Sequence, residues 1–275
     1  LALLAFLLGS AEVLRDNTAQ TVLPRIVTKD QLERANGLLW STEQLTGQFL
    51  GPPLAGILIG VAVALPFGAN AALLAGAVGL TSMLVLPWRP APAAGRTAFG
   101  TELREGLSFL WRHPVLRPMA FALGAFNFIG YAFWALIVLY AQEVLHLDAT
   151  GYGLLLSAAA AGGLAGSLAG PGILRRIGPK AGLLAGVTGF SIASATLAMA
   201  PHVLIVAVAL MLDAFLNMLW NLTSVSYRQR HVPMEMLGRV NSVYRFFGTG
   251  PSAFGSLAGG ALVAAVTAPL GLADA

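Results

Sequence analysis

Arg25-Ile-Val-Thr-Lys-Asp-Gln-Leu-Glu-Arg-Ala-Asn36 forms a short basic stretch between two long apolar segments. The chain repeats it 205 positions later as Arg230-His-Val-Pro-Met-Glu-Met-Leu-Gly-Arg-Val-Asn241. Six of 25 ungapped positions are identical, against about two expected by chance from ordinary composition. The identical pairs are Arg25 and Arg230, Val27 and Val232, Leu32 and Leu237, Arg34 and Arg239, Asn36 and Asn241, and Phe49 and Phe254. A basic loop repeated between apolar segments predicts a duplicated membrane bundle.

The composition also favours a membrane protein. Of the 275 residues, 57% are hydrophobic and 10% are charged, whereas a soluble domain carries about 25% charged residues. So little charge cannot cover a water-facing surface, which argues against a soluble protein. The net charge of +4 is compatible with nucleic-acid binding. However, the basic residues lie in short loops between apolar segments, so no nucleic-acid partner is expected.

Eight segments are long and apolar enough to span a bilayer, which takes about 20 mainly apolar residues. They are Leu1 to Leu23, Ala35 to Gly60, Leu65 to Leu86, Arg117 to Ala141, Gly151 to Leu174, Ala181 to Ala200, Val203 to Tyr227 and Val240 to Thr267. Of the 16 basic residues, 14 fall in loops on one side of these segments. The positive-inside rule makes that side cytoplasmic. We therefore expect a multi-pass protein of the cell membrane.

The long connection between the third and fourth segments divides the chain. Residues 1–87 are predicted to be the last three helices of an amino-terminal half, and residues 117–275 the first five of a carboxy-terminal half. Residues 88–116 are predicted to be a cytoplasmic linker with a short amphipathic helix. The predicted fold is an all-α membrane bundle of two six-helix repeats, with eight of twelve helices present. Because the sequence starts at Leu1 and not at Met, we expect a fragment of a longer protein.

Small residues predict where helices approach one another closely. Glycines spaced by four residues form a stripe that permits close helix packing. The glycines with this spacing are Gly162, Gly166 and Gly170, then Gly182 and Gly186, and finally Gly255 and Gly259. A chain with 32 glycines also produces such spacings by chance, so this second explanation stays open.

Ionisable residues within the predicted helices are confined to the four segments of the repeat. Such residues are costly in a membrane and usually face the bundle interior. The ionisable residues, together with amides on the same helix faces, are Glu12, Arg15, Asp16 and Gln20 in the first segment, Glu43 in the second, Asp213, Asn217 and Asn221 in the seventh, and Arg245 in the eighth. We expect these side chains to form a cavity between the halves for substrate and protons. The alternative is structural, with Arg15 neutralising Glu12 or Glu43 and holding helices together.

A polar cavity of this kind suits proton-coupled transport. Burial disfavours the charged form of a carboxylate, so Asp213 or Glu43 can take up and release a proton. Protonation and substrate binding then compete for the same charge. No GxxxxGK[ST] motif indicates an ATP site. No cofactor, metal site or enzymatic activity is expected, because the four histidines are scattered and no nucleophile lies beside a base.

The repeated basic loops predict a gate at the cytoplasmic side. The residues expected to form it are Arg25, Arg34, Asn36, Arg175, Arg176, Arg230, Arg239 and Asn241. The alternative is that these basic residues only set the topology. The repeated asparagines argue against that alternative, because asparagine carries no charge.

The second segment contains Gly47-Gln-Phe-Leu-Gly51-Pro52-Pro-Leu-Ala-Gly56. It resembles G-x-x-x-G-P-x-x-G-G, the antiporter motif of drug exporters in the major facilitator superfamily, with Ala55 in place of one glycine. The linker from Glu102 to Arg117 and the loop from Arg228 to Val240 resemble the enterobactin-exporter-like branch of that superfamily (transmembrane secretion effectors). The resemblance covers essentially the whole chain. It implies that the helix-packing residues Gly47, Gly51, Pro52 and Gly56 seal the two halves reversibly.

Two positions depart from the pattern of this superfamily. Arg175 stands where the cytoplasmic gating loop is expected to carry an acid. The first segment lacks the Arg-x-x-Gln-Gly pattern of the best-known drug–proton antiporters, since Gln20 follows Arg15 by five residues.

Together these patterns predict a secondary active transporter that exports a small amphipathic molecule, drug-like or siderophore-like, in exchange for protons. The two halves are expected to rock around a site near the bilayer midplane. The expected partners are the small-molecule substrate, protons and the lipid bilayer. Two alternatives stay open. The first is an importer with the same fold, and the second is a non-transporting membrane protein such as a sensor or a truncated remnant.

Overall fold

The structure, a computed structural model, describes residues 2–83, 99–199 and 202–267, and every regular element in these ranges is a helix. This confirms the predicted all-α class. The elements are α1 (Ala2–Ile26), α2 (Leu32–Gln44), the π-helix η1 (Leu45–Leu50), α3 (Gly51–Val61), α4 (Leu65–Ser82), α5 (Phe99–Arg112), α6 (Leu116–Leu139), the π-helix η2 (Tyr140–Val144), α7 (Ala149–Met199), α8 (Val203–His231) and α9 (Met234–Thr267).

Helix α7 consists of two arms joined by a sharp turn, and the arms correspond to the fifth and sixth predicted segments. Gly178, at the turn, has φ 77° and ψ 169°, a left-handed conformation that glycine adopts without a side-chain clash. Pro179 follows, and its fixed φ suits the first turn of the second arm. The predicted loop shrinks to this turn, so Arg175 and Arg176 lie in the last turn of the first arm.

The predicted loop between the last two segments is also mostly helical. Helix α8 extends through it and α9 begins two residues later, so only Val232 and Pro233 lie between the two helices. Basic side chains in the last turn of α8 favourably oppose the negative end of the helix dipole. The predicted loop residues Arg228, Arg230 and Arg239 therefore sit on helices, which fixes their directions.

The predicted single helix from Ala35 to Gly60 is divided into α2, η1 and α3. Pro52 and Pro53 open α3 and have no backbone N–H, so the α-helical hydrogen-bond ladder cannot run through them. The wider turns of η1 bridge the interruption, as π-helical turns do inside longer helices.

Glycines set how closely the carboxy-terminal helices α6–α9 pack. A Cβ atom on Gly162 of α7 would lie 2.0 Å from the carbonyl oxygen of Met211 on α8. A Cβ atom on Gly255 of α9 would lie 2.1 Å from the carbonyl oxygen of Phe128 on α6. The close packing predicted from the glycine stripes is therefore confirmed. At the other glycines of these stripes a Cβ atom would also lie within 2.7 Å of an atom of another residue. These glycines are Gly166, Gly170, Gly182, Gly186 and Gly259.

Buried apolar side chains of these helices form three clusters, each fixing part of the bundle. One ties α5 to α6 and α9 and contains Leu110, Leu116, Met119, Ala120, Val232, Leu237, Val240, Val243 and Tyr244. A second lies at the opposite end and contains Ile137, Leu155, Ala193, Leu197, Val206 and Leu210. A third lies between α7 and α8 and contains Leu174, Leu219 and Leu222. Inside a bilayer such packing stabilises mainly through van der Waals contact.

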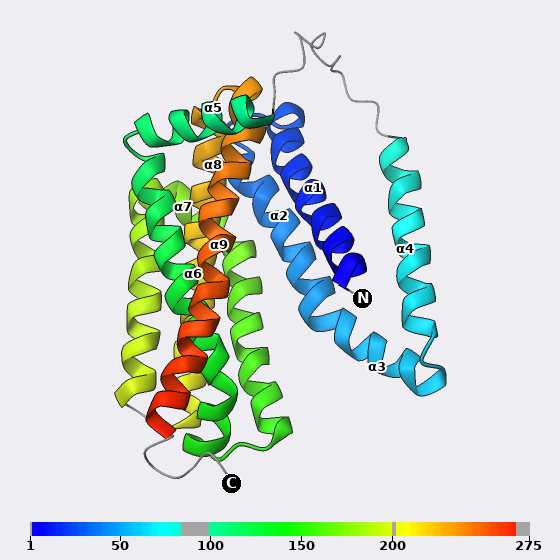
Figure 1. Cartoon of the computed structure of the whole chain (residues 1–275), viewed down its shortest axis with the longest axis vertical. Coiled ribbons are helices and arrows are strands. Elements are labelled where there is room, and N and C mark those ends of the chain that lie inside the picture. Colours follow the sequence, from blue (N-terminus) through cyan, green and yellow to red (C-terminus); the bar gives the residue numbers. More distant parts are fainter. Residues whose placement is uncertain (1, 84–98, 200–201, 268–275) are drawn as a thin grey trace.

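The amino-terminal helices α1–α4 meet the carboxy-terminal helices at one end and diverge from them at the other (Figure 1). Helices α1 and α2 approach α8 and α9 at the end where α5 lies, while α3 and α4 stand away from the bundle (Figure 1). No residue in the apolar window of α4 is buried. The α5 end is the one predicted to be cytoplasmic, so the arrangement is closed at that end and open at the other.

Four helical stretches in the described part of the chain are long and apolar enough to cross a membrane: Leu65–Ser82, Leu116–Val144, Ala149–Met199 and Val203–His231. Because α7 has two arms, these stretches account for five of the eight predicted spans. The other three predicted spans are α1, the stretch from α2 to α3, and α9. Helices α2 and α3 have 13 and 11 residues, each shorter than a spanning helix, because η1 divides this segment. Helix α1 carries Glu12, Arg15 and Asp16 within its apolar stretch.

Candidate functional site

Most of the predicted polar residues line one of two cavities. The first has a volume of about 400 Å³ and lies among α6, α7 and α8, with Gln44 of α2 at its border. Asp213, Asn217 and Asn221 line it from one face of α8, as their four-residue spacing predicts. We call this space the Asp213 cavity.

Aromatic rings form much of the wall of the Asp213 cavity. Phe126 lies edge-on to Trp220, with ring centroids 5.2 Å apart, and is tilted against Phe190 at 5.8 Å. Such arrangements hold rings in fixed positions. The aromatic residues of the lining are Phe126, Tyr131, Trp134, Phe190 and Trp220. The cavity therefore offers flat apolar surfaces around the polar face of α8.

Two polar atoms of this lining are buried without a protein partner. Neither Oδ1 of Asp213 nor Nε1 of Trp220 has a hydrogen-bond partner among the described residues. The neighbouring amides satisfy each other, because Asn221 donates to Oδ1 of Asn217 at 2.7 Å. An unsatisfied buried polar atom costs about 1–3 kcal/mol, and in native proteins it usually has a functional reason. The described lining includes no Lys or Arg that would neutralise Asp213.

The second cavity, also about 400 Å³, lies between α1 and α2 and reaches Val225 of α8. Its lining includes the predicted residues Arg15, Asp16, Gln20 and Glu43, with Asn36. Arg15 lies 2.8 Å from Asp16 and 3.9 Å from Glu43. Arg15 and Glu43, which form the contact between α1 and α2, are each about two-thirds exposed. Exposed ion pairs contribute little stability, so the alternative role of Arg15, holding these helices together, would stabilise the fold only slightly.

Glu12 and Arg245 line neither of these two cavities. Glu12 is exposed on α1. Arg245 of α9 instead donates to Asp16 at 3.1 Å, which joins the two sets of helices. The predicted residues thus form one cavity within the carboxy-terminal helices, a second beside α1, and an ion pair between the two sets.

The repeated arginine Arg230 makes a direct contact between the two copies of the repeat. Its guanidinium donates to the carbonyl oxygen of Lys29 at 3.0 and 2.8 Å. It also forms an ion pair with Glu33. This side chain therefore ties the end of α8 to the turn between α1 and α2.

The repeated asparagine Asn36 makes a second contact of this kind. Its buried amide donates to Gln229 at 2.7 Å and to Ser226 at 3.2 Å, both on α8. Gln229 in turn donates to the carbonyl oxygen of Gln20 at 3.0 Å. Nearby, Asn17 donates to Ser242 of α9 at 3.0 Å. These neutral hydrogen bonds, like the ion pairs, join the two sets of helices at the α5 end, and we call these contacts the closure.

The second copy of the motif makes contacts within the carboxy-terminal helices. Arg239 pairs with Glu105 at 2.6 Å and Glu102 at 3.3 Å, both on α5. Asn241 accepts from the buried Arg228 at 3.0 Å. The guanidinium carbon of Arg228 also lies 3.9 Å from the centre of the Tyr244 ring. Equivalent positions of the repeat therefore have different partners.

The remaining predicted gate residues lie around this closure. Arg34 and Arg175 line a groove of about 370 Å³ between α2 and α7. Arg176 lies beside Arg175 in a neighbouring surface hollow. Arg25 is half-buried in the last turn of α1. A gating role stays a prediction for these four arginines and for Asn36, Arg230, Arg239 and Asn241 alike.

The antiporter-like motif lies on η1 and α3, away from the closure. Gly47, Gly51, Pro52 and Gly56 are all exposed. A Cβ atom on Gly47 or Gly56 would meet no described atom within 4 Å. No described helix packs on these two glycines, so the predicted seal stays a prediction.

Several residues of the site were missed by reasoning from the sequence. Gln44, Asn127 and Trp220 line the Asp213 cavity, and Gln229 belongs to the closure. Asn127 had a signal, because it is an amide in the middle of an otherwise apolar segment. Because its amide is not ionisable, the pattern of ionisable residues did not identify it.

The sequence profile described as Major Facilitator Superfamily matches residues 1–256. The chain belongs to this superfamily. The enterobactin exporter EntS of Citrobacter koseri is 26% identical to it over 247 residues, or 89% of this chain and 58% of the exporter. The enterobactin exporters EntS of Salmonella typhi and Salmonella typhimurium give the same values. The predicted resemblance to the superfamily and to its enterobactin-exporter-like branch is confirmed.

Solved structures show the same fold. A bacterial homologue of the iron transporter ferroportin in an outward-facing state matches with a TM-score of 0.65 and 20% identity, over 91% of this chain and 62% of that one. A structure of a bacterial ferroportin homologue with soaked iron matches with a TM-score of 0.60 and 19% identity, over 91% of this chain and 61% of that one. The chain thus spans less than two thirds of the length of these relatives. Among its described residues no group of three or more His, Asp or Glu side chains is placed to hold a metal ion.

Proposed function

We propose that this chain is part of a multi-pass transporter of the cell membrane that exports a small amphipathic molecule in exchange for protons. The observation that carries the proposal is the Asp213 cavity, an aromatic space with one buried, unpaired carboxylate oxygen. Its volume falls within the usual range of small-molecule sites, about 300–1,000 Å³. Membership of the superfamily and the exporter relatives support transport as the activity.

The lining indicates the chemistry of the substrate. Five aromatic rings favour a molecule with flat apolar groups. Asp213 favours a neutral or cationic group over an anionic one, because no Lys or Arg of the described lining would balance a second negative charge. The enterobactin exporters among its relatives support a siderophore-like molecule entering in an uncharged form.

We expect proton exchange because Oδ1 of Asp213 is buried without a hydrogen-bond partner among the described residues. Without a protein partner, a buried carboxylate is stabilised either by binding a proton or by binding a cationic or hydrogen-bonding group of the substrate. The two occupants compete, so release of one accompanies binding of the other. Coupling of this kind requires the cavity to open to each side of the membrane in turn.

The contacts of the cytoplasmic closure support alternating access. The ion pairs and hydrogen bonds between the two sets of helices lie at the α5 end, and the helices diverge at the opposite end (Figure 1). We interpret this as the state that opens outward. Breaking these few polar contacts would let the cytoplasmic end open.

The proposal is tested by efflux from cells that express the full-length protein. Cells loaded with a fluorescent aromatic cation or with a catechol siderophore are expected to lose it faster than cells without the protein. A protonophore is expected to remove this difference. Accumulation instead of loss would indicate an importer, and the absence of any movement would contradict transport.

Cross-linking the closure is expected to stop export. Asn17 and Ser242 are in hydrogen-bond contact across the closure, and the 275 residues contain no cysteine. In the Asn17→Cys/Ser242→Cys variant, a short bis-methanethiosulfonate cross-linker, which joins each thiol through a disulfide, is expected to abolish efflux. A reductant that breaks these disulfides is expected to restore it. The control pair Asn17→Cys/Gly250→Cys places the second thiol about 12 Å farther along α9, where the linker cannot reach. Full efflux from a cross-linked protein would contradict the alternating-access mechanism.

A further inference from the structure

Helix α5 lies across the end of the bundle rather than along it. It runs over the closure, crosswise to α6 and α9 (Figure 1). Since α6 and α9 correspond to predicted spans, we expect α5 to lie along the cytoplasmic surface of the bilayer. Its sequence divides into three faces with different properties.

The first face packs on α9. Leu110 is 1% exposed, and a Cβ atom on Gly106 would lie 2.9 Å from the carbonyl oxygen of Arg239. This contact, with the pairing of Arg239 to Glu102 and Glu105, fixes the rotation of α5. The other two faces are therefore held in defined directions.

The second face is apolar and uncovered. Leu103, Leu107 and Trp111 recur every four residues and are 47%, 40% and 50% exposed. Trp111 packs edge-on against Phe121 of α6, with ring centroids 5.7 Å apart. Phe121 is itself exposed on the outside of the bundle. The apolar face of α5 is thus continuous with exposed apolar surface of α6.

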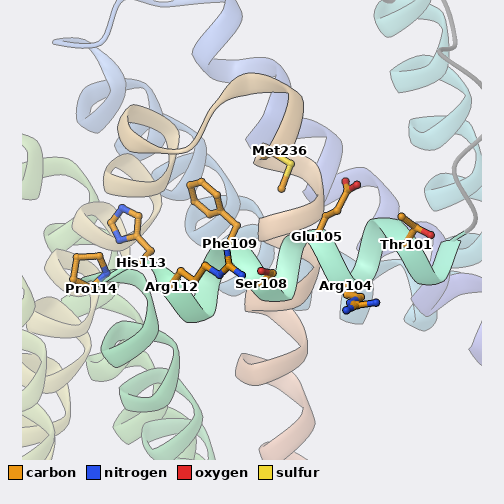
Figure 2. A pocket seen from close by; sticks show the side chains of 9 residues that line it. All are labelled: Thr101, Arg104, Glu105, Ser108, Phe109, Arg112, His113, Pro114 and Met236. Atoms are coloured by element: carbon orange, nitrogen blue, oxygen red, sulfur yellow. The ribbon is translucent and has the colours of Figure 1, made fainter.

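The third face is basic. Arg104, Ser108 and Arg112 also recur every four residues, next to the apolar face, and line a hollow of about 700 Å³ (Figure 2). Both arginines are exposed and have no ion pair among the described residues. Glu105 borders the same hollow, but Arg239 engages its carboxylate at 2.6 Å. The arginines therefore keep their charge uncompensated.

His113, at the end of the hollow, adds no further positive charge at neutral pH. Burial lowers the pKa of His113, and nearby His231 lowers it further. Its Nδ1 atom accepts backbone N–H groups of Val115 and Leu116 at 3.3 and 3.2 Å, which caps the start of α6. The charge of the hollow is therefore set by its two arginines.

We propose that the basic face of α5 binds the headgroup phosphates of anionic phospholipids in the cytoplasmic leaflet, while its apolar face inserts into the acyl boundary. An apolar stripe beside a basic one, on a helix parallel to the bilayer, is the arrangement of interfacial helices that select anionic lipids. Residues 84–98, which precede α5 in the sequence, do not suit the arginines as a partner, because they include Arg89 and Arg96 and no acid. This lipid site is independent of the substrate and of the direction of transport.

The inference is tested with the full-length protein in nanodiscs. A bimane fluorophore attached at Leu107→Cys reports nearby acyl chains through quenching by brominated lipid. At equal mole fraction, brominated phosphatidylglycerol is expected to quench the fluorophore more than brominated phosphatidylcholine. Each arginine is expected to favour phosphatidylglycerol at the site about fivefold, equivalent to about 1 kcal/mol. Adding Arg104→Gln and Arg112→Gln is expected to remove this preference.

A matched control removes the same charge elsewhere on the same side of the membrane. Arg175→Gln with Arg176→Gln, both exposed on α7, is expected to leave the preference at position 107 unchanged. Equal quenching by the two lipids before any arginine is replaced would overturn the inference. A preference that survives loss of Arg104 and Arg112, or that inorganic phosphate removes, would overturn it as well.

Discussion

Asp213→Asn is expected to abolish proton-coupled export by the full-length protein while leaving it folded and inserted. The amide has nearly the same shape as the carboxylate, so the aromatic lining of the cavity is preserved. It cannot bind a proton in exchange for substrate, and it cannot carry the charge that attracts a cationic group. Losing one charged hydrogen bond costs about 1.5–3 kcal/mol, or about tenfold to hundredfold in affinity for a cationic substrate.

The measurement is efflux by vesicles or cells with an imposed proton gradient, normalised to the amount of protein in the membrane. Asp148→Asn is the matched control, because Asp148 is exposed and lies outside the cavity. Its side chain accepts the N–H of Gly151 at 2.7 Å at the start of α7, a cap that asparagine also makes. Normal export by Asp213→Asn would show that another group carries the proton.

Gly162→Val is expected to disrupt the packing of α7 on α8 and so reduce the yield of folded protein. The Cβ position at Gly162 is 2.0 Å from a backbone oxygen of α8, so the two helices must separate to admit any side chain. Forcing extra atoms into a packed contact costs about 1–3 kcal/mol and sometimes more. Because Asp213 follows Met211 closely on α8, such a separation would also distort the cavity.

The control for this change is Gly153→Val on the same helix, where a Cβ atom would meet no described atom within 4 Å. We expect it to behave like the unaltered protein when the two variants are compared by size-exclusion profile and by melting temperature in detergent. Equal melting temperatures for Gly153→Val and Gly162→Val would mean that α7 and α8 do not pack as closely as the structure places them.

Features that depend on short spacings along one helix could be predicted from the sequence. Apolar runs gave the helices, since a segment of about 20 apolar residues can satisfy its backbone in a membrane only by hydrogen-bonding to itself. The four-residue stripe that begins at Gly162 gave a close helix contact, and the one that begins at Asp213 gave a polar helix face. These are local properties, because residues four apart share a face whatever the rest of the chain does.

Which helix faces meet could not be predicted in this way and became clear from the three-dimensional arrangement of the helices. Asn36 and Asn241 occupy equivalent positions of the repeat, yet Asn36 binds across the closure and Asn241 accepts from Arg228 of its own set of helices. Asp16 and Asp213 both lie on polar stripes, yet Asp16 pairs with Arg245 and Asp213 faces aromatic rings. Spacing defines a face of one helix, but the tilt and crossing of its neighbours decide what that face meets, and no pattern within a single helix encodes them.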